Sequence, residues 1–245
     1  MLNSSLKFRF KAFGIHLGIS ILIALVSLYI VFMVWHPVPL AKVVGVTHIF
    51  IMMLGIDVIL GPLLTLIVAK EGKKSLKFDL AIIIILQLAA FSYGIYNIAI
   101  SRPVYIAFDT IRFEVVQANN IPDESLNIAT SPYNTLAWGE PKFVAVKPAK
   151  NTAQKNNRLF VELETGVAPS MQPNLYEPLA NQWTTINLKS KSLNTLYQTN
   201  SKVAVDNILT KYPSATMWLP LKAYVQDMVV LIDDDNVVDI VDLKP

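Results

Sequence analysis

Three long apolar runs occupy most of the first hundred positions of this chain, at residues 12–35, 43–69 and 80–100. The first and third runs contain no Lys, Arg, Asp or Glu, and the second contains only Asp57. A helix of about 20 apolar residues crosses the hydrocarbon core of a bilayer. The first run also exceeds the apolar core of a secretory signal peptide, so we expect it to be retained. The pattern therefore predicts a domain of three transmembrane helices at residues 1–101.

The hydrophobic pattern changes at residue 102. Short runs rich in Val, Ile and Phe are typical of strands, and they predict strands at 104–108, 111–116, 143–147, 159–164, 228–233 and 237–242. Residues 193–198 and 203–211 favour helices, and the Gly and Pro residues of 166–178 predict an irregular loop. We therefore expect residues 102–245 to form one α+β domain.

Two acidic patterns in this second domain have structural interpretations. Glu162 and Glu164 alternate with apolar residues, which is typical of the solvated face of a strand. The run from Asp233 to Asn236 lacks the Gly and the distal Glu of a calcium loop. Because it separates two alternating apolar runs, it predicts a hairpin turn.

Charge divides the chain at the same place. Residues 1–100 hold eight Lys or Arg and three Asp or Glu, whereas residues 101–245 hold thirteen and fifteen. Over the whole chain 16% of residues are charged, against roughly 25% in soluble domains. This composition disfavours a cytosolic enzyme, and the charge balance gives no indication of nucleic-acid binding. The absence of cysteine excludes disulfides and thiolate metal sites.

Basic residues beside the apolar runs predict the orientation of the chain. Seven of them fall on one side, namely Lys7, Arg9, Lys11, Lys70, Lys73, Lys74 and Lys77. Lys42 and Arg102 fall on the other side. Because cytoplasmic loops are enriched in Lys and Arg, we expect a cytoplasmic N-terminus. Three crossings then place the C-terminal domain outside, in the periplasm of a bacterium.

Asp57 is the residue in the apolar runs that most needs an explanation. It lies about 20 Å along a helix from the nearest basic flank, and a carboxyl group at that depth costs about 2.5–3.5 kcal/mol. Asp57, Gly61 and Thr65 recur every four residues and share a face, and Pro62 predicts a kink after Gly61. Two interpretations stay open: a contact inside the helical bundle, for instance with Gln87, or a contact with a polar group on a partner's membrane helix.

Small or polar residues recur at helical spacing in all three runs. They include Gly14 and Gly18 in the first run, Gly55 in the second, and Gln87 and Gly94 in the third. Small residues four positions apart let helices approach closely. The pattern therefore predicts a bundle that also accepts a further helix.

No set of residues in the sequence indicates catalysis. An aspartyl dyad needs two adjacent carboxyl groups, but Asp57 and Asp79 are separated by about 20 Å of helical rise. His16 and His48 lie at opposite ends of their runs and cannot share one site, so we interpret both as interfacial or packing residues. The sequence has no Gly-x-Ser-x-Gly, His-Glu-x-x-His or phosphate-loop motif. We therefore expect no catalytic residue, cofactor or metal.

Several short segments occur along the chain in a specific order. They are His36-Pro37, Gly55-Ile-Asp57-Val-Ile-Leu-Gly61-Pro62-Leu63-Leu64-Thr65, Lys77-Phe-Asp79-Leu80, Gln87, Tyr93-Gly94, Arg102-Pro103-Val104-Tyr105 and Arg112-Phe113. In this combination the chain resembles the TfpX/TfpZ (FimB-like) type IV pilin accessory proteins over roughly residues 35–115. The resemblance implies a non-catalytic inner-membrane protein that works alongside the major pilin.

From this resemblance we expect a pilin-specific chaperone, or a modulator of pilin assembly and surface piliation. The implied partners are the transmembrane helix and head domain of the type IV major pilin, inner-membrane lipid and the pilus assembly machinery, with no nucleic acid. The alternative is a membrane-anchored periplasmic sensor or ligand-binding subunit of a signalling or envelope complex. The segments of this chain that are expected in the cytoplasm, residues 1–11 and 70–79, are too short for an output domain. Signalling would therefore need a partner protein.

Overall fold

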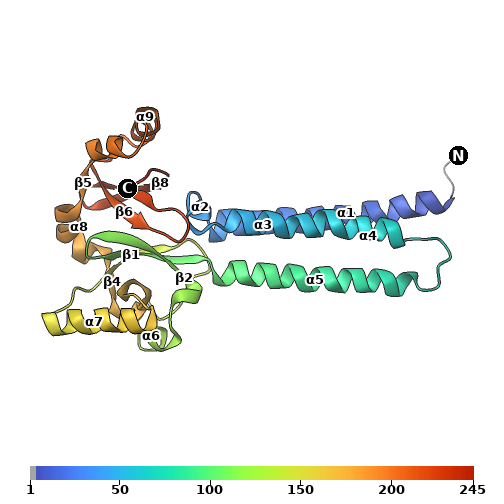
Figure 1. Cartoon of the computed structure of the whole chain (residues 1–245), viewed down its shortest axis with the longest axis horizontal. Coiled ribbons are helices and arrows are strands. Elements are labelled where there is room, and N and C mark those ends of the chain that lie inside the picture. The colour runs from blue at the N-terminus through green and yellow to red at the C-terminus, as the bar shows by residue number, and fades with distance from the viewer. Residues whose placement is uncertain (1–3) are drawn as a thin grey trace. The chain divides into compact units, whose positions relative to one another are not determined.

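The computed structural model describes residues 4–245, and the chain forms two compact units (Figure 1). The first unit runs up to Val34 and resumes over Gly45–Ile100. The second unit comprises Trp35–Val44 together with Ser101–Pro245. The short connection between the first two apolar runs is therefore part of the second unit, which the sequence did not indicate.

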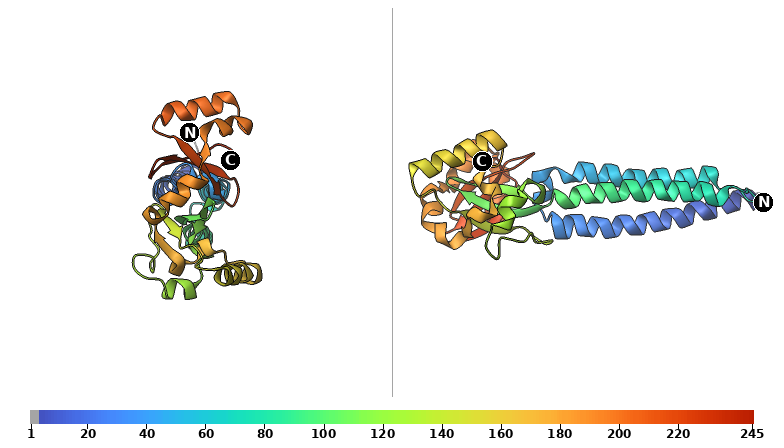
Figure 2. Two further views of the ribbon diagram at one scale, coloured as in Figure 1. Left: turned by 90° about the vertical axis from the view of Figure 1, so that its left-hand side faces the viewer. Right: turned by 90° about the horizontal axis from the view of Figure 1, so that it is seen from below.

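The first unit consists of three long apolar helices, as the hydrophobic pattern predicts. The first is α1 (Ser4–Tyr29), which continues as the π-helical turn η1 (Ile30–Trp35). The second comprises α3 (Val46–Gly55), η2 (Ile56–Leu60) and α4 (Gly61–Val68), and the third is α5 (Leu76–Ile100). Each is long and apolar enough to cross a membrane. The second helix contacts both of the others (Figure 2).

At Gly61-Pro62, where the sequence predicts a kink, the structure has a π-helical turn, η2, immediately before Gly61. The N–H of Gly61 bonds to the carbonyl of Ile56, five residues back. Pro62 has no N–H to give, so a regular ladder of hydrogen bonds cannot continue through this point. Single π-helical turns of this kind occur often at functional sites. This one contains Asp57.

The second unit is built on a mixed eight-stranded sheet, which confirms the α+β class. Its strands are β1 (Pro103–Asp109), β2 (Arg112–Gln117), β3 (Lys142–Val146), β4 (Tyr176–Pro178), β5 (Lys191–Ser192), β6 (Met217–Lys222), β7 (Met228–Asp233) and β8 (Asn236–Val241). The order is β4-β3-β1-β2-β6-β7-β8, and β5 pairs with β6. The pairs β1–β3 and β2–β6 are parallel, and the others are antiparallel. The helices are α6 (Asp123–Asn127), α7 (Thr152–Thr165), α8 (Trp183–Lys189) and α9 (Lys202–Lys211).

The helix α2 (Leu40–Val44), which lies between the first two apolar runs, packs into the core of this second unit. Leu40 and Val43 are 4% and 0% exposed, and they belong to the same apolar cluster as strand residues such as Phe113. The N–H of Val225 donates to the carbonyl of Val43 at 3.1 Å. This short segment is therefore a structural part of the sheet domain.

The predicted strand at 159–164 is wrong, because these residues belong to the helix α7. Asn151 caps this helix by accepting a hydrogen bond from the N–H of Gln154 at 2.8 Å, and Gly166 ends it at φ 73°. These are common helix start and stop signals, and they outweigh the short alternating pattern of Glu162 and Glu164. Both glutamates therefore lie on a helix and not on a strand face.

The other predictions for the second unit match the structure more closely. Five of the six predicted strands correspond to β1, β2, β3, β7 and β8, and 203–211 is the helix α9. Residues 193–198 form a 3₁₀ helix, and 166–178 contains two 3₁₀ turns followed by β4. The predicted hairpin turn joins β7 to β8, with Asp233 paired to Asn236 and Asp234 at φ 45°. The strands β4, β5 and β6 were not predicted.

Candidate functional site

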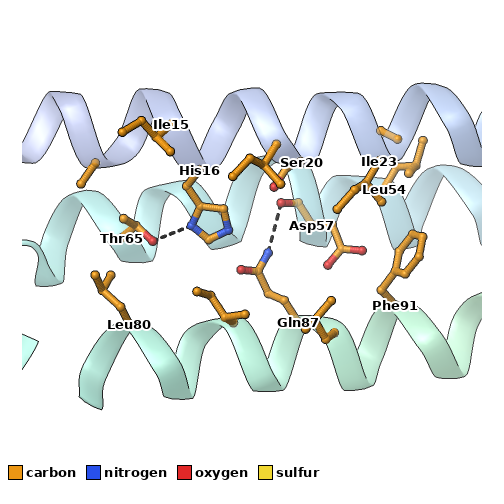
Figure 3. A pocket seen from close by; sticks show the side chains of 15 residues that line it. Ile15, His16, Ser20, Ile23, Leu54, Asp57, Thr65, Leu80, Gln87 and Phe91 are labelled. Atoms are coloured by element: carbon orange, nitrogen blue, oxygen red, sulfur yellow. Dashed lines mark hydrogen bonds between the residues drawn. The ribbon is translucent and has the colours of Figure 1, made fainter. Parts of the chain in front are cut away.

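A groove of about 570 Å³ runs along the first unit between α1, the η2–α4 segment and α5 (Figure 3). Its walls are mostly apolar, and several wall side chains remain exposed: Ile15 by 57%, Ile19 by 55% and Leu88 by 53%. Polar side chains line it as well, from three helices: His16, Ser20, Asp57, Thr65 and Gln87. An apolar groove with a few convergent polar groups is the typical form of a binding site.

Asp57 has the most unusual environment in this groove. Its side chain is 9% exposed, and both carboxyl oxygens are buried with no hydrogen-bond partner among the described residues. Gln87 does contact Asp57, but its Nε2 donates to the main-chain carbonyl of Asp57 at 3.2 Å. Gln87, the residue named for the internal interpretation of Asp57, therefore bonds to its main chain and does not satisfy its carboxyl group. Gln87 Oε1 is also buried without a partner among the described residues.

His16 belongs to the same groove, which the sequence did not indicate. Its Nδ1 lies 2.6 Å from Thr65 Oγ1, so a hydrogen bond joins α1 to α4. A signal was available, because His16 and Ser20 are four residues apart and share one face of α1. His48 is exposed and does not line the groove.

The predicted shared face on the second helix is present, since Asp57, Gly61 and Thr65 are all buried. Pro62, beside them, is buried as well. A Cβ at Gly61 would overlap the amide group of Gln87, so glycine is what lets that side chain cross to the carbonyl of Asp57. Gly61 therefore acts inside the bundle.

The other glycines divide into two groups. A Cβ at Gly94 would press on the flexible side chain of Met53, so Gly94 lies at a contact between α5 and α3. Gly55 has no atom within 4 Å of its Cβ position, and neither do Gly14 and Gly18, which are exposed. The close packing expected of Gly14 and Gly18 is therefore not made within the described chain.

We expect Gly61→Ala to lower the thermal stability of the full chain in detergent. The new methyl group displaces Gln87 and breaks its hydrogen bond, at a cost of about 1 kcal/mol. Gly55→Ala is the matched control, because it adds the same methyl group to the same helix in open space. Equal melting temperatures for the two variants would show that Gln87 does not depend on Gly61.

Basic residues gather at one end of the first unit. Lys7, Arg9 and Lys11 lie in the first turns of α1, and four lysines lie in or beside the connection from α4 to α5. Ser4 Oγ donates to Glu71 Oε2 at 3.0 Å, which places the start of α1 beside that connection. Lys73 pairs with Asp79 at 2.6 Å. The two groups of basic residues thus share one end of the helices.

Charged residues in the second unit have structural partners. Arg102 is 4% exposed, donates from Nε and Nη2 to the carbonyl of Ala137 at 3.2 Å, and lies 4.0 Å from the ring centre of Trp138. Burial lowers the pKa of the Arg102 guanidinium. Arg112 pairs with the buried Glu114 at 2.7 Å. Both arginines therefore stabilise the fold.

A second cavity of about 540 Å³ lies over β2 and β6 in this unit. Its basic side chains are Arg112, Lys189, Lys191 and Lys222. Arg112 is engaged by Glu114, and Lys222 lies 3.8 Å from the same carboxylate. The groove in the first unit is the stronger candidate site, because it contains buried polar atoms that have no hydrogen-bond partner in the part of the chain that the structure describes.

Comparison with known proteins finds relatives that are named for fimbrial assembly. The profile of the family described as fimbrial assembly protein FimB matches residues 4–45. A fimbrial assembly protein of Dichelobacter nodosus, serogroup I, is 31% identical over 188 residues, which cover 76% of this chain and 73% of the relative. Its counterpart of serogroups C1 and C2 is 38% identical over 116 residues, or 46% of this chain and 88% of the relative. No solved structure matches the chain.

Proposed function

Because this chain belongs to the FimB family of fimbrial assembly proteins, we propose that it is an inner-membrane accessory protein of the type IV pilus system. It binds the major pilin without catalysis, as a pilin-specific chaperone or a modulator of pilin assembly and surface piliation. The groove between α1, the η2–α4 segment and α5 is the observation that supports this proposal. It is apolar, as a site for a membrane helix must be. It also contains the carboxyl group of Asp57, which has no hydrogen-bond partner within residues 4–245.

The occupant of this groove is proposed to be the apolar helix of a pilin subunit held in the membrane. Helices associate in lipid through close packing and interhelical hydrogen bonds. The exposed walls, such as Ile19 and Leu88, supply packing surface. Asp57 and Gln87 supply polar atoms that nothing else in the described chain engages. The second unit, including α2, is the part proposed to meet the pilin head.

The orientation we propose places the basic end of the helices in the cytoplasm and the sheet domain in the periplasm. Seven basic residues at that end support it, because cytoplasmic segments are enriched in Lys and Arg. Reporter fusions at Lys74 and Lys150 are expected to show cytoplasmic and periplasmic activity, respectively. A periplasmic signal at Lys74 would contradict this orientation.

Affinity purification of the detergent-solubilised chain from its native cells tests the function. We expect the major pilin, identified by mass spectrometry, to be enriched, and deletion of the gene to change the amount of surface pili. An unrelated three-helix membrane protein with the same tag is the control. Enrichment of a histidine kinase or another signalling subunit in place of pilin would overturn the proposal in favour of a sensor subunit.

A further inference from the structure

Three oxygen atoms in the groove lack hydrogen-bond partners among the described residues: Asp57 Oδ1, Asp57 Oδ2 and Gln87 Oε1. The hydrogen bond from Gln87 to the main-chain carbonyl of Asp57 needs a donor, so the atom that makes it is Nε2. The other atom of the Gln87 amide is therefore the oxygen Oε1. Both side chains point into the space between the helices (Figure 3). All three unpartnered atoms are hydrogen-bond acceptors, so the site has an excess of acceptors over donors.

Protonation of Asp57 does not remove this imbalance. An ionised carboxylate is an acceptor only, and a protonated one supplies a single O–H. If that O–H bonded to Gln87 Oε1, the second oxygen of Asp57 would still lack a donor. The neighbouring His16 supplies none, because its Nδ1 is engaged with Thr65 and neither carboxyl oxygen of Asp57 has a hydrogen-bond partner among the described residues. The site therefore needs donors in either protonation state of Asp57.

Lipid tails have no donors, and an unsatisfied polar group in hydrocarbon is costly. We infer that the helix received by this groove carries a hydrogen-bond donor, an amide, hydroxyl or ammonium group, at the level of Asp57. This inference rests on the proposed function and adds the chemical class that the site selects. A helix that is apolar throughout fits the walls but leaves the carboxyl oxygens of Asp57 and Oε1 of Gln87 without donors.

Synthetic helices test the inference on the full chain reconstituted in lipid nanodiscs. The two probes are labelled 20-residue Leu/Ala helices with Lys at both ends, one with a central Asn and one with a central Leu of similar size. Binding is measured by energy transfer to a dye on the chain. We expect the Asn helix to bind about fivefold more tightly, the scale of one interhelical hydrogen bond. Repeating both titrations on Asp57→Leu should abolish that difference.

The outcomes separate the inference from the proposed function. Equal binding of the two helices to the unmodified chain would overturn the donor inference and leave the groove as a helix site. An Asn preference that persists in Asp57→Leu would also overturn it, because the donor would then be recognised elsewhere than at Asp57. Binding of neither helix would overturn both the inference and the proposed role of the groove.

Discussion

Asp57→Leu is expected to reduce co-purification of pilin by about tenfold while the chain itself remains abundant. Interhelical hydrogen bonds in membranes contribute on the order of 1 kcal/mol each, and this change removes acceptors for more than one. The carboxyl group makes no hydrogen bond within the described chain. Its removal should therefore cost the bundle nothing and relieve about 2.5–3.5 kcal/mol of insertion cost. Pilin recovery, chain abundance and melting temperature in detergent are measured together.

Asp57→Asn is the matched control for this experiment, because it keeps a hydrogen-bonding group of the same size. We expect it to retain most pilin binding. A fall in abundance or melting temperature of Asp57→Leu, with loss of pilin following from it, would instead support a purely internal role for Asp57. Normal abundance with unchanged pilin recovery in both variants would remove Asp57 from the mechanism.

Leu40→Ala is expected to destabilise the sheet domain by about 2–5 kcal/mol, the usual cost of emptying a leucine site in a core. For a unit of this size that corresponds to a fall in melting temperature of about 5–15 °C. The physical reason is that Leu40 is 4% exposed and packs in the same apolar cluster as the central strands. Thermal unfolding of the full chain in detergent, followed by tryptophan fluorescence, measures the change.

Leu188→Ala is the control, because Leu188 is in the same unit and 79% exposed. It should shift the melting temperature by no more than about 1 °C. A fragment of residues 102–245 should likewise be less stable than the same unit in the intact chain, since it lacks both Leu40 and Val43. If that fragment and Leu40→Ala both unfold at the temperature of the unmodified unit, α2 does not contribute to its core.

Long hydrophobic patterns in the sequence predicted the fold more reliably than short ones. The three apolar runs exceed 20 residues, so their helical character overrides local detail. The strand predictions succeeded at short runs rich in Val, Ile and Phe, from the interior strands β1 and β2 to the edge strand β8. They failed at α7, where Asn151 and Gly166 were the better signals, and at β6, where Pro220 argues against a strand.

The candidate site was only partly visible in the sequence. Asp57 could be identified because a lone carboxyl group in an apolar run is costly. His16 was interpreted as an interfacial or packing residue because it cannot share a site with His48. Its contact with Thr65 joins positions 49 residues apart, so no local pattern indicated it. The role of α2 was invisible for the same reason, since Val43 meets strands far along the chain. Contacts between distant segments depend on tertiary packing, which periodicity does not encode.

Photo-cross-linking from the groove tests the central claim most directly. A photoreactive amino acid is placed at Ile19 or Leu88, which line the groove, or at Ile59, which is 61% exposed and does not line it. The account predicts cross-links to the membrane helix of pilin from Ile19 and Leu88 and only lipid adducts from Ile59. Pilin cross-links of equal yield from all three positions, or from Ile59 alone, would contradict it.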